Sequence, residues 1–294
     1  MARTAWQPGT PRRVPMASPA VAATAVVRAA VDRPKSKPVP LGYPVGSNTF
    51  QSRVLFILKE TAPYSKIINV LELNMTKSRI NKIILNSSGI FSDDKLEIIT
   101  EAFTIAVRST RKLLQVLPNI DVVFYHNPEM VIPETGIGGN TDTQNIIMIP
   151  LDADFGLNQH ELMLTICHEL HHAARMSQLG DTDSLLKKIV SEGLADQFEL
   201  EIDPNHHPIT YRKDLSSEDI QRGLRDLRQI IQSKDGEYDY YEWFFGYGKY
   251  PNWFGYTIGN FIISNYWEKS ELTPAELVNQ SAEGFIPFLD ELIS

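Results

Sequence analysis

The chain lacks features that mark several classes of protein. It has a single cysteine, Cys167, which excludes an intrachain disulfide and argues against a closed, thiolate-rich structural zinc site. No apolar run approaches the roughly 18 residues of a membrane-spanning helix. The formal net charge is −8 and no long basic face interrupts it, which argues against a nucleic-acid partner. The remaining composition is that of an ordinary globular protein, long enough for a sizeable core.

Acidic residues are scarce at the start of the chain, where Asp32 is the only one among residues 1–40. Seven prolines in the same stretch cannot lie inside helices or central strands, so we expect residues 1–44 to be disordered. An arginine-rich, acid-poor segment also fits a targeting leader, which would imply export or delivery to an organelle. A dispensable tail is the simpler interpretation, and it goes with a cytoplasmic location.

The motif H-E-x-x-H is formed by His168, Glu169 and His172, within an apolar stretch that reads as one long helix. Histidines four residues apart on an α-helix lie about 40° apart around its axis and one turn apart along it, so both rings can reach one metal ion. Glu169 can take a proton from the attacking water, as in a zinc-dependent peptidase. Buried histidines and carboxylates are costly without partners, and a metal supplies the partner.

A second helical segment, after a break at Gly180-Asp181, carries a candidate third ligand, Glu192. Zinc hydrolases keep three protein ligands and leave a fourth position open, and two histidines with one glutamate are a standard set. Asp196 lies one helical turn beyond Glu192 and should face the same side. It is placed to accept the second N–H of His168 and so to fix the tautomer of that ring.

At these residues the chain resembles the gluzincins, in which H-E-x-x-H precedes a helix that carries the glutamate ligand, with E-x-x-x-D in the thermolysin-like branch. More narrowly, HELHHAAR and SEGLADQF resemble the bacterial family described as predicted zinc-dependent proteases (domain of unknown function 2268), over residues 138–266. The resemblance implies an α+β zincin-like fold, with a small sheet whose edge strand lies beside the H-E-x-x-H helix. It implies zinc-dependent proteolysis and names no substrate.

Other metal-hydrolase layouts do not fit. A metzincin would have glycine and a third histidine where this chain has Arg175 and Gln178. A peptide deformylase uses a cysteine ligand, but Cys167 lies about 100° around the helix from His168 and cannot join the same metal. A di-iron carboxylate protein would need a second E-x-x-H, which the chain does not have.

The residues before the motif predict part of a sheet. Residues 120–126 and 145–150 are rich in β-branched and aromatic side chains and predict strands. The glycines Gly138-Gly139 between them mark either a close backbone approach or a plain turn. Pro150 at the end of the second strand suggests a sheet edge. Peptidases of this kind commonly bind substrate as a strand added along such an edge, so we predict substrate contacts at Asn145, Ile147 and Ile149.

Gluzincins often stabilise the oxyanion with a tyrosine or histidine well after the glutamate ligand. The candidates here are Tyr240, Tyr241, Tyr247, Tyr250, Tyr256 and the pair His206-His207. We predict Tyr256, because it lies on a predicted helix between Gly255 and Gly259 and a rigid element holds a donor better than a loop. A core tyrosine with its hydroxyl bonded elsewhere is the alternative.

The sequence thus predicts zinc-dependent hydrolysis of peptide bonds, with Glu169 as general base. The folded domain is expected at residues 45–294, with an α/β part at 45–179 and a helical part at 180–294 that supplies the third ligand. A peptide or protein substrate is the expected partner, and the oligomeric state is left open. Two alternatives also stay open: a catalytically silent fold that keeps the metal and acts by binding, and a zinc amidase for a non-peptide substrate. Glu169 favours an enzyme, because a structural site needs no base.

Overall fold

A small mixed sheet forms the first part of the fold. The computed structural model describes residues 78–180, 183–208, 215–233 and 236–294, so the predicted tail at 1–44 and the residues that follow it up to 77 lie outside the described chain. The sheet has the order β1-β2-β4-β3, with strands β1 (Ile80–Ile84), β2 (Ile120–His126), β3 (Asn140–Thr143) and β4 (Ile146–Leu151). β1, β2 and β4 are parallel, and β3 runs antiparallel to β4.

The strand predicted at the sheet edge lies inside the sheet. β4 pairs with β2 on one side and with β3 on the other, so the prediction that residues 145–150 form an edge is wrong. Pro150 is tolerated because β3 is short: it pairs with β4 only as far as Met148. Among the described residues the edge strands are β1 and β3, and β3 is the one that packs against the helix that carries the motif. The strand predicted at 120–126 is confirmed as β2.

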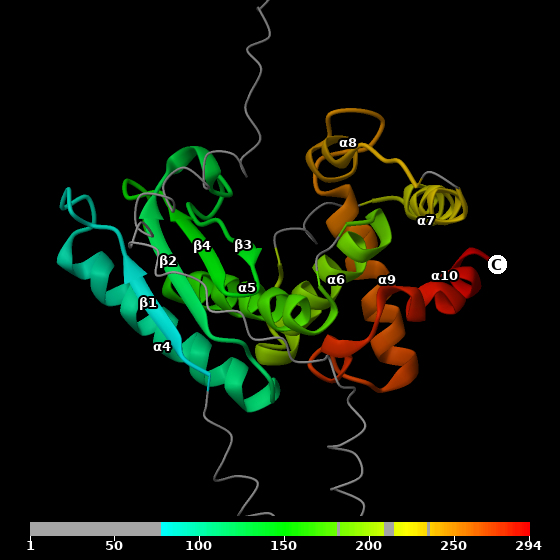
Figure 1. The fold of residues 1–294 in the computed structure, drawn as a ribbon. Helices are drawn as coiled ribbons and strands as arrows, with labels where there is room; N and C mark the ends of the chain where they lie inside the picture. Colours follow the sequence, from blue (N-terminus) through cyan, green and yellow to red (C-terminus); the bar gives the residue numbers. More distant parts are fainter. Residues whose placement is uncertain (1–77, 181–182, 209–214, 234–235) are drawn as a thin grey trace, which may run out of the picture. The chain divides into compact units, whose positions relative to one another are not determined.

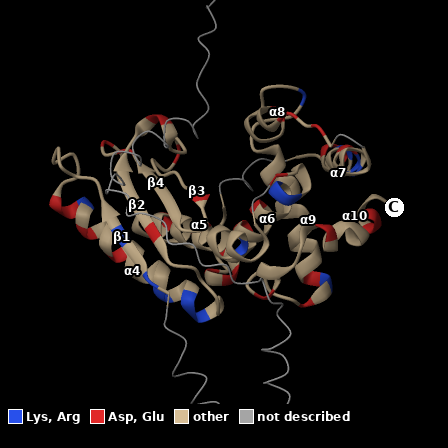
Figure 2. Ribbon diagram, in the orientation of Figure 1, with Lys and Arg blue, Asp and Glu red and all other residues tan. Residues whose placement is uncertain are grey.

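Two long helices pack against each other beside the sheet (Figure 1). α4 (Asp93–Leu113) joins β1 to β2, and α5 (Gln159–Leu179) follows β4. α4 begins with acidic residues and ends with basic ones, as Figure 2 shows, which matches the helix dipole. Asn158 caps α5 as predicted, since its Oδ1 accepts from the backbone N–H of His160 at 2.9 Å and of Glu161 at 3.2 Å.

The second part of the chain is helical, as expected. It comprises α6 (Leu185–Ile202), α7 (Ser217–Gln232), α8 (Tyr240–Phe245), α9 (Phe254–Ser270), two 3₁₀ segments (Glu276–Asn279 and Ala282–Phe285) and α10 (Ile286–Ile293). These helices share a second cluster of buried apolar residues, while the sheet, α4 and α5 share the first. The predicted division of the domain at residue 180 stays a prediction. The described helices include none that is both long and apolar enough to cross a membrane.

Two glycines let α6 and α9 touch at the backbone. A Cβ on Gly193 would lie 2.2 Å from the carbonyl oxygen of Gly259, and a Cβ on Gly259 would lie 2.2 Å from that of Ile189. Any side chain at either glycine would therefore force the helices apart. Since Gly193 follows Glu192 directly, this close crossing brings the third candidate ligand next to α9.

Candidate metal centre

Three side chains from α5 and α6 converge on one point. Nε2 of His168 and Nε2 of His172 are 3.0 Å apart, and Oε2 of Glu192 lies 3.4 Å and 3.3 Å from them. Ligand atoms on a tetrahedral zinc ion with bonds of about 2.0–2.1 Å lie about 3.4 Å from one another. The triangle formed by His168, His172 and Glu192 therefore has the size that a zinc ion requires.

The hydrogen bonds around the two histidines also fit a metal. Nδ1 of His168 lies 2.9 Å from a carboxylate oxygen of Glu199, and Nδ1 of His172 lies 3.0 Å from Oγ of Ser191. A carboxylate accepts, so His168 donates from Nδ1, and in the neutral ring that a metal requires the lone pair of Nε2 would face the triangle. With a carboxylate at the same point, a bound cation is the partner that satisfies all three groups.

The carboxylate that orients His168 is Glu199, on the predicted face of α6 but one turn further along. Asp196, predicted for this role, is buried and has its Oδ1 3.6 Å from Nδ1 of His168, beyond hydrogen-bond distance. Glu199 is closer by 0.7 Å (3.6 Å against 2.9 Å). His168, Asp196 and Glu199 could also hold an ion as a group, but a ligating histidine normally gives one nitrogen to the metal and the other to such a carboxylate.

The pKa values of the converging groups reflect their closeness. Burial would lower the pKa of His168, but Glu192 and Glu199 raise it well above its ordinary value. Burial would raise the pKa of Glu192, but His172 and His168 lower it well below its ordinary value. The carboxylates are therefore ionised and attract positive charge, which is what a cation-binding centre needs.

Glu169 is close enough to the triangle for its charge to act on His168, but it is not one of the three converging groups. Its side chain is 5% exposed, and its Oε2 accepts a hydrogen bond of 2.7 Å from the hydroxyl of Thr141 on β3. A Cβ on Gly139 would lie 2.4 Å from Oε1 of Glu169, so the glycine is there for close approach and not merely for a turn. The edge strand and the loop before it thus hold the carboxylate in place.

Tyr256, the predicted oxyanion donor, lies near the centre. Burial raises its pKa well above the ordinary value, and the negative charges of Glu192, Asp196 and Glu169 raise it further. The negative charge of Glu192 also acts on the hydroxyl of Tyr240, which shares a hydrogen bond with Tyr256. Both hydroxyls are therefore protonated at neutral pH and able to donate.

The other tyrosine candidates lie elsewhere. The Tyr250 hydroxyl is bonded to Asp226, and Tyr241 and Tyr247 are 43% and 73% exposed. His207 is exposed as well. Of the candidates, Tyr256 and Tyr240 are the ones on which the charge of Glu192 acts.

The residues predicted to bind substrate do not line an open edge. Ile147 and Ile149 are fully buried within β4, so that prediction is wrong for both. Their burial follows from the position of β4 between two strands. Asn145 is exposed in the β3–β4 turn, where its side-chain amide donates to the Asn119 carbonyl. Among the described strands, the edge beside α5 belongs instead to β3.

Sequence reasoning missed three supporting side chains: Glu199, Ser191 and Thr141. Glu199 could have been predicted from its spacing, because it lies seven residues after Glu192 and therefore on the same face of the helix. Ser191 precedes the glutamate ligand but gives no pattern of its own. Thr141 comes from a distant strand and could not be found without the fold.

One comparison with known proteins identifies a family. The profile of the family described as "Predicted Zn-dependent protease (DUF2268)" matches residues 96–287, which include the sheet strands β2 to β4, α5, α6 and α9. Neither the curated proteins nor the solved structures contain a match to this chain. Since the family profile spans well over half of the sequence and includes every residue of the metal centre, this chain belongs to the family of predicted zinc-dependent proteases, domain of unknown function 2268.

Proposed function

We propose that this protein is a zinc-dependent peptidase whose zinc ion is held by His168, His172 and Glu192. When bound, zinc would polarise the scissile carbonyl and lower the pKa of the attacking water. The observation that carries the proposal is the position of Glu169. It is a buried carboxylate beside the three ligands, and its Oε2 is held by Thr141. A site that used its metal only for structure would need the ligands and no such base.

In this proposal Glu169 moves the proton. Its carboxylate accepts a proton from the water as the water attacks, and then delivers it to the nitrogen of the leaving amine. The hydrogen bond from Thr141 fixes the carboxylate in one orientation, which removes the need to order it during the reaction. Tyr256 would donate a hydrogen bond to the carbonyl oxygen as negative charge develops there, with Tyr240 orienting its hydroxyl.

The edge strand β3 would bind the substrate backbone. Of its four residues, Asn140, Asp142 and Thr143 are exposed, while Thr141 turns toward Glu169. An extended peptide paired with this edge would run beside the base, because one residue of the strand contacts it. Main-chain pairing of this kind selects an extended peptide and leaves the side-chain preference to the surrounding surface.

The decisive experiment is Glu169→Gln, assayed on a broad peptide library together with bound zinc. We expect the variant to fold and to keep its zinc, and to lose at least about 100-fold in turnover, because the amide cannot accept the proton. His172→Ala is the complementary variant and should lose the metal as well. Equal turnover by Glu169→Gln and wild type would exclude the general-base role. A zinc-loaded wild type that cleaves no peptide would favour a silent binding fold or an amidase for another substrate.

A further inference from the structure

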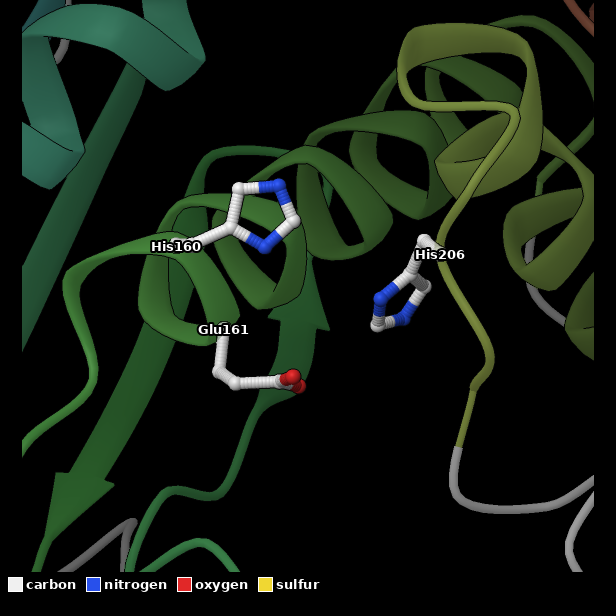
Figure 3. A group of neighbouring side chains, drawn as sticks. All are labelled: His160, Glu161 and His206. Carbon is white, nitrogen blue, oxygen red and sulfur yellow. The ribbon is translucent and has the colours of Figure 1, made fainter.

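A second group of metal-ligating side chains lies where α5 begins. His160 and Glu161 belong to the first turn of this helix, and His206 follows the end of α6. One potential ligand atom from each of these residues lies within 4.8 Å of the other two. Figure 3 shows both imidazole rings and the carboxylate facing a common space. None of the three belongs to the proposed catalytic triangle.

Each histidine of this group already has one ring nitrogen held by a carboxylate. Nε2 of His160 lies 3.0 Å from Oδ2 of Asp203, and Nε2 of His206 lies 3.1 Å from Oε2 of Glu199. Nδ1 is therefore the nitrogen that each ring can offer to a metal. A metal-ligating histidine usually has a carboxylate at the ring nitrogen that does not bind the metal. This carboxylate fixes the tautomer and makes the ring a better donor to the metal.

The charges and the burial of the group also favour a cation. Three carboxylates lie near the two histidines: those of Glu161, Asp203 and Glu199. The partial positive charge of the helix N-terminus offsets only about half of one negative charge. His206 is 7% exposed, so its ring is held in place, whereas the His160 side chain is 49% exposed and free to adjust. The ligand atoms lie within 4.8 Å of one another, and a bound tetrahedral ion would draw them to a separation of about 3.4 Å.

We propose that His160, Glu161 and His206 form a second metal site, which takes zinc or another late first-row divalent cation. Two imidazole nitrogens and one carboxylate oxygen suit zinc better than calcium or magnesium, which prefer oxygen ligands. The site is more open than the proposed catalytic centre, so it should hold its ion less tightly. Glu199 links the two sites, because one of its oxygens lies beside His206 and the other beside His168.

Equilibrium dialysis measures how many zinc ions bind per chain of untagged full-length protein, in wild type and in variants of each site. We expect wild type to bind a second, weaker equivalent that His160→Ala and Glu161→Gln lose. His172→Ala should lose the tight equivalent and retain the weak one. His207→Ala removes an exposed neighbouring imidazole and should retain both. Thermal melts confirm that each variant is folded, and anomalous scattering from zinc-soaked crystals should place an ion between His160 and His206.

The outcomes separate this site from the proposed function. If wild type binds a single zinc ion that His172→Ala loses and His160→Ala keeps, the second site is refuted and the catalytic centre stands. If the weak equivalent survives both His160→Ala and Glu161→Gln, it lies elsewhere and the second site is again refuted. A zinc ion that only His160→Ala and Glu161→Gln release supports the second site even if no peptide is cleaved.

Discussion

The hydroxyl of Thr141 donates a hydrogen bond of 2.7 Å to Oε2 of Glu169, which ties the edge strand β3 to the middle of α5. The same hydroxyl lies 3.0 Å from the backbone carbonyl oxygen of Glu169. One residue of the strand therefore holds the proposed base in position. The proposed substrate edge and the proposed base are therefore linked by one side chain.

Thr141→Val should lower turnover by about 10- to 100-fold, because it keeps the shape of the side chain and removes the group that orients Glu169. Bound zinc should stay at the wild-type level, since the Thr141 hydroxyl bonds to Glu169 and not to the three proposed ligands. Steady-state kinetics with parallel metal analysis measure both quantities. Thr141→Ser keeps the hydroxyl and should recover most of the lost turnover. A valine variant as active as wild type would show that Glu169 needs no such support.

Glu199→Gln should weaken zinc binding at the catalytic centre by about 10- to 100-fold, because the amide is a poorer acceptor for the N–H of His168. Asp196→Asn is the matched variant on the same helix and should have the smaller effect, since Asp196 lies 3.6 Å from that nitrogen. Competition with a chromophoric chelator measures both affinities. A larger loss in Asp196→Asn would restore the assignment made from the sequence.

Tyr256→Phe should lower kcat by roughly 100-fold while KM and bound zinc stay near their wild-type values, because the hydroxyl acts only on the developing charge. Tyr240→Phe should have a smaller effect, since that hydroxyl acts through Tyr256. Kinetics on one good peptide substrate compare the two variants. If Tyr240→Phe loses more than Tyr256→Phe, the roles of the two tyrosines are exchanged.

Gly259→Ala should destabilise the fold by about 1–3 kcal/mol, because the new methyl group would meet the carbonyl oxygen of Ile189 and push α9 away from α6. Gly156→Ala is the control: nothing lies within 4 Å of a Cβ there, so the free energy of unfolding should change by less than about 0.5 kcal/mol. Chemical denaturation measures both. Equal stability of the two variants would mean that α6 and α9 can separate without cost.

Local spacing was enough to predict that the rings of His168 and His172 face a common point. His168 and His172 lie on one helix, where four residues make one turn, so no knowledge of the rest of the fold is needed to bring their rings together. Strand β2 and the cap at Asn158 were predictable for the same reason: each depends on a few neighbouring residues. The second helical segment and the usual ligand set of zinc hydrolases added Glu192, and the family resemblance, carried by short motifs on α5 and α6, added the α+β class.

Only the tertiary structure decided which distant groups meet these residues. Strand order depends on pairing across the whole sheet, so the sequence could not show that β4 lies inside and that β3 is the edge beside Glu169. The crossing of α6 and α9 at Gly193 and Gly259 brings Tyr256 to the centre. The turn after α6 likewise brings His206 to Glu199 and to the start of α5. Such contacts arise from packing between elements, which no local pattern encodes.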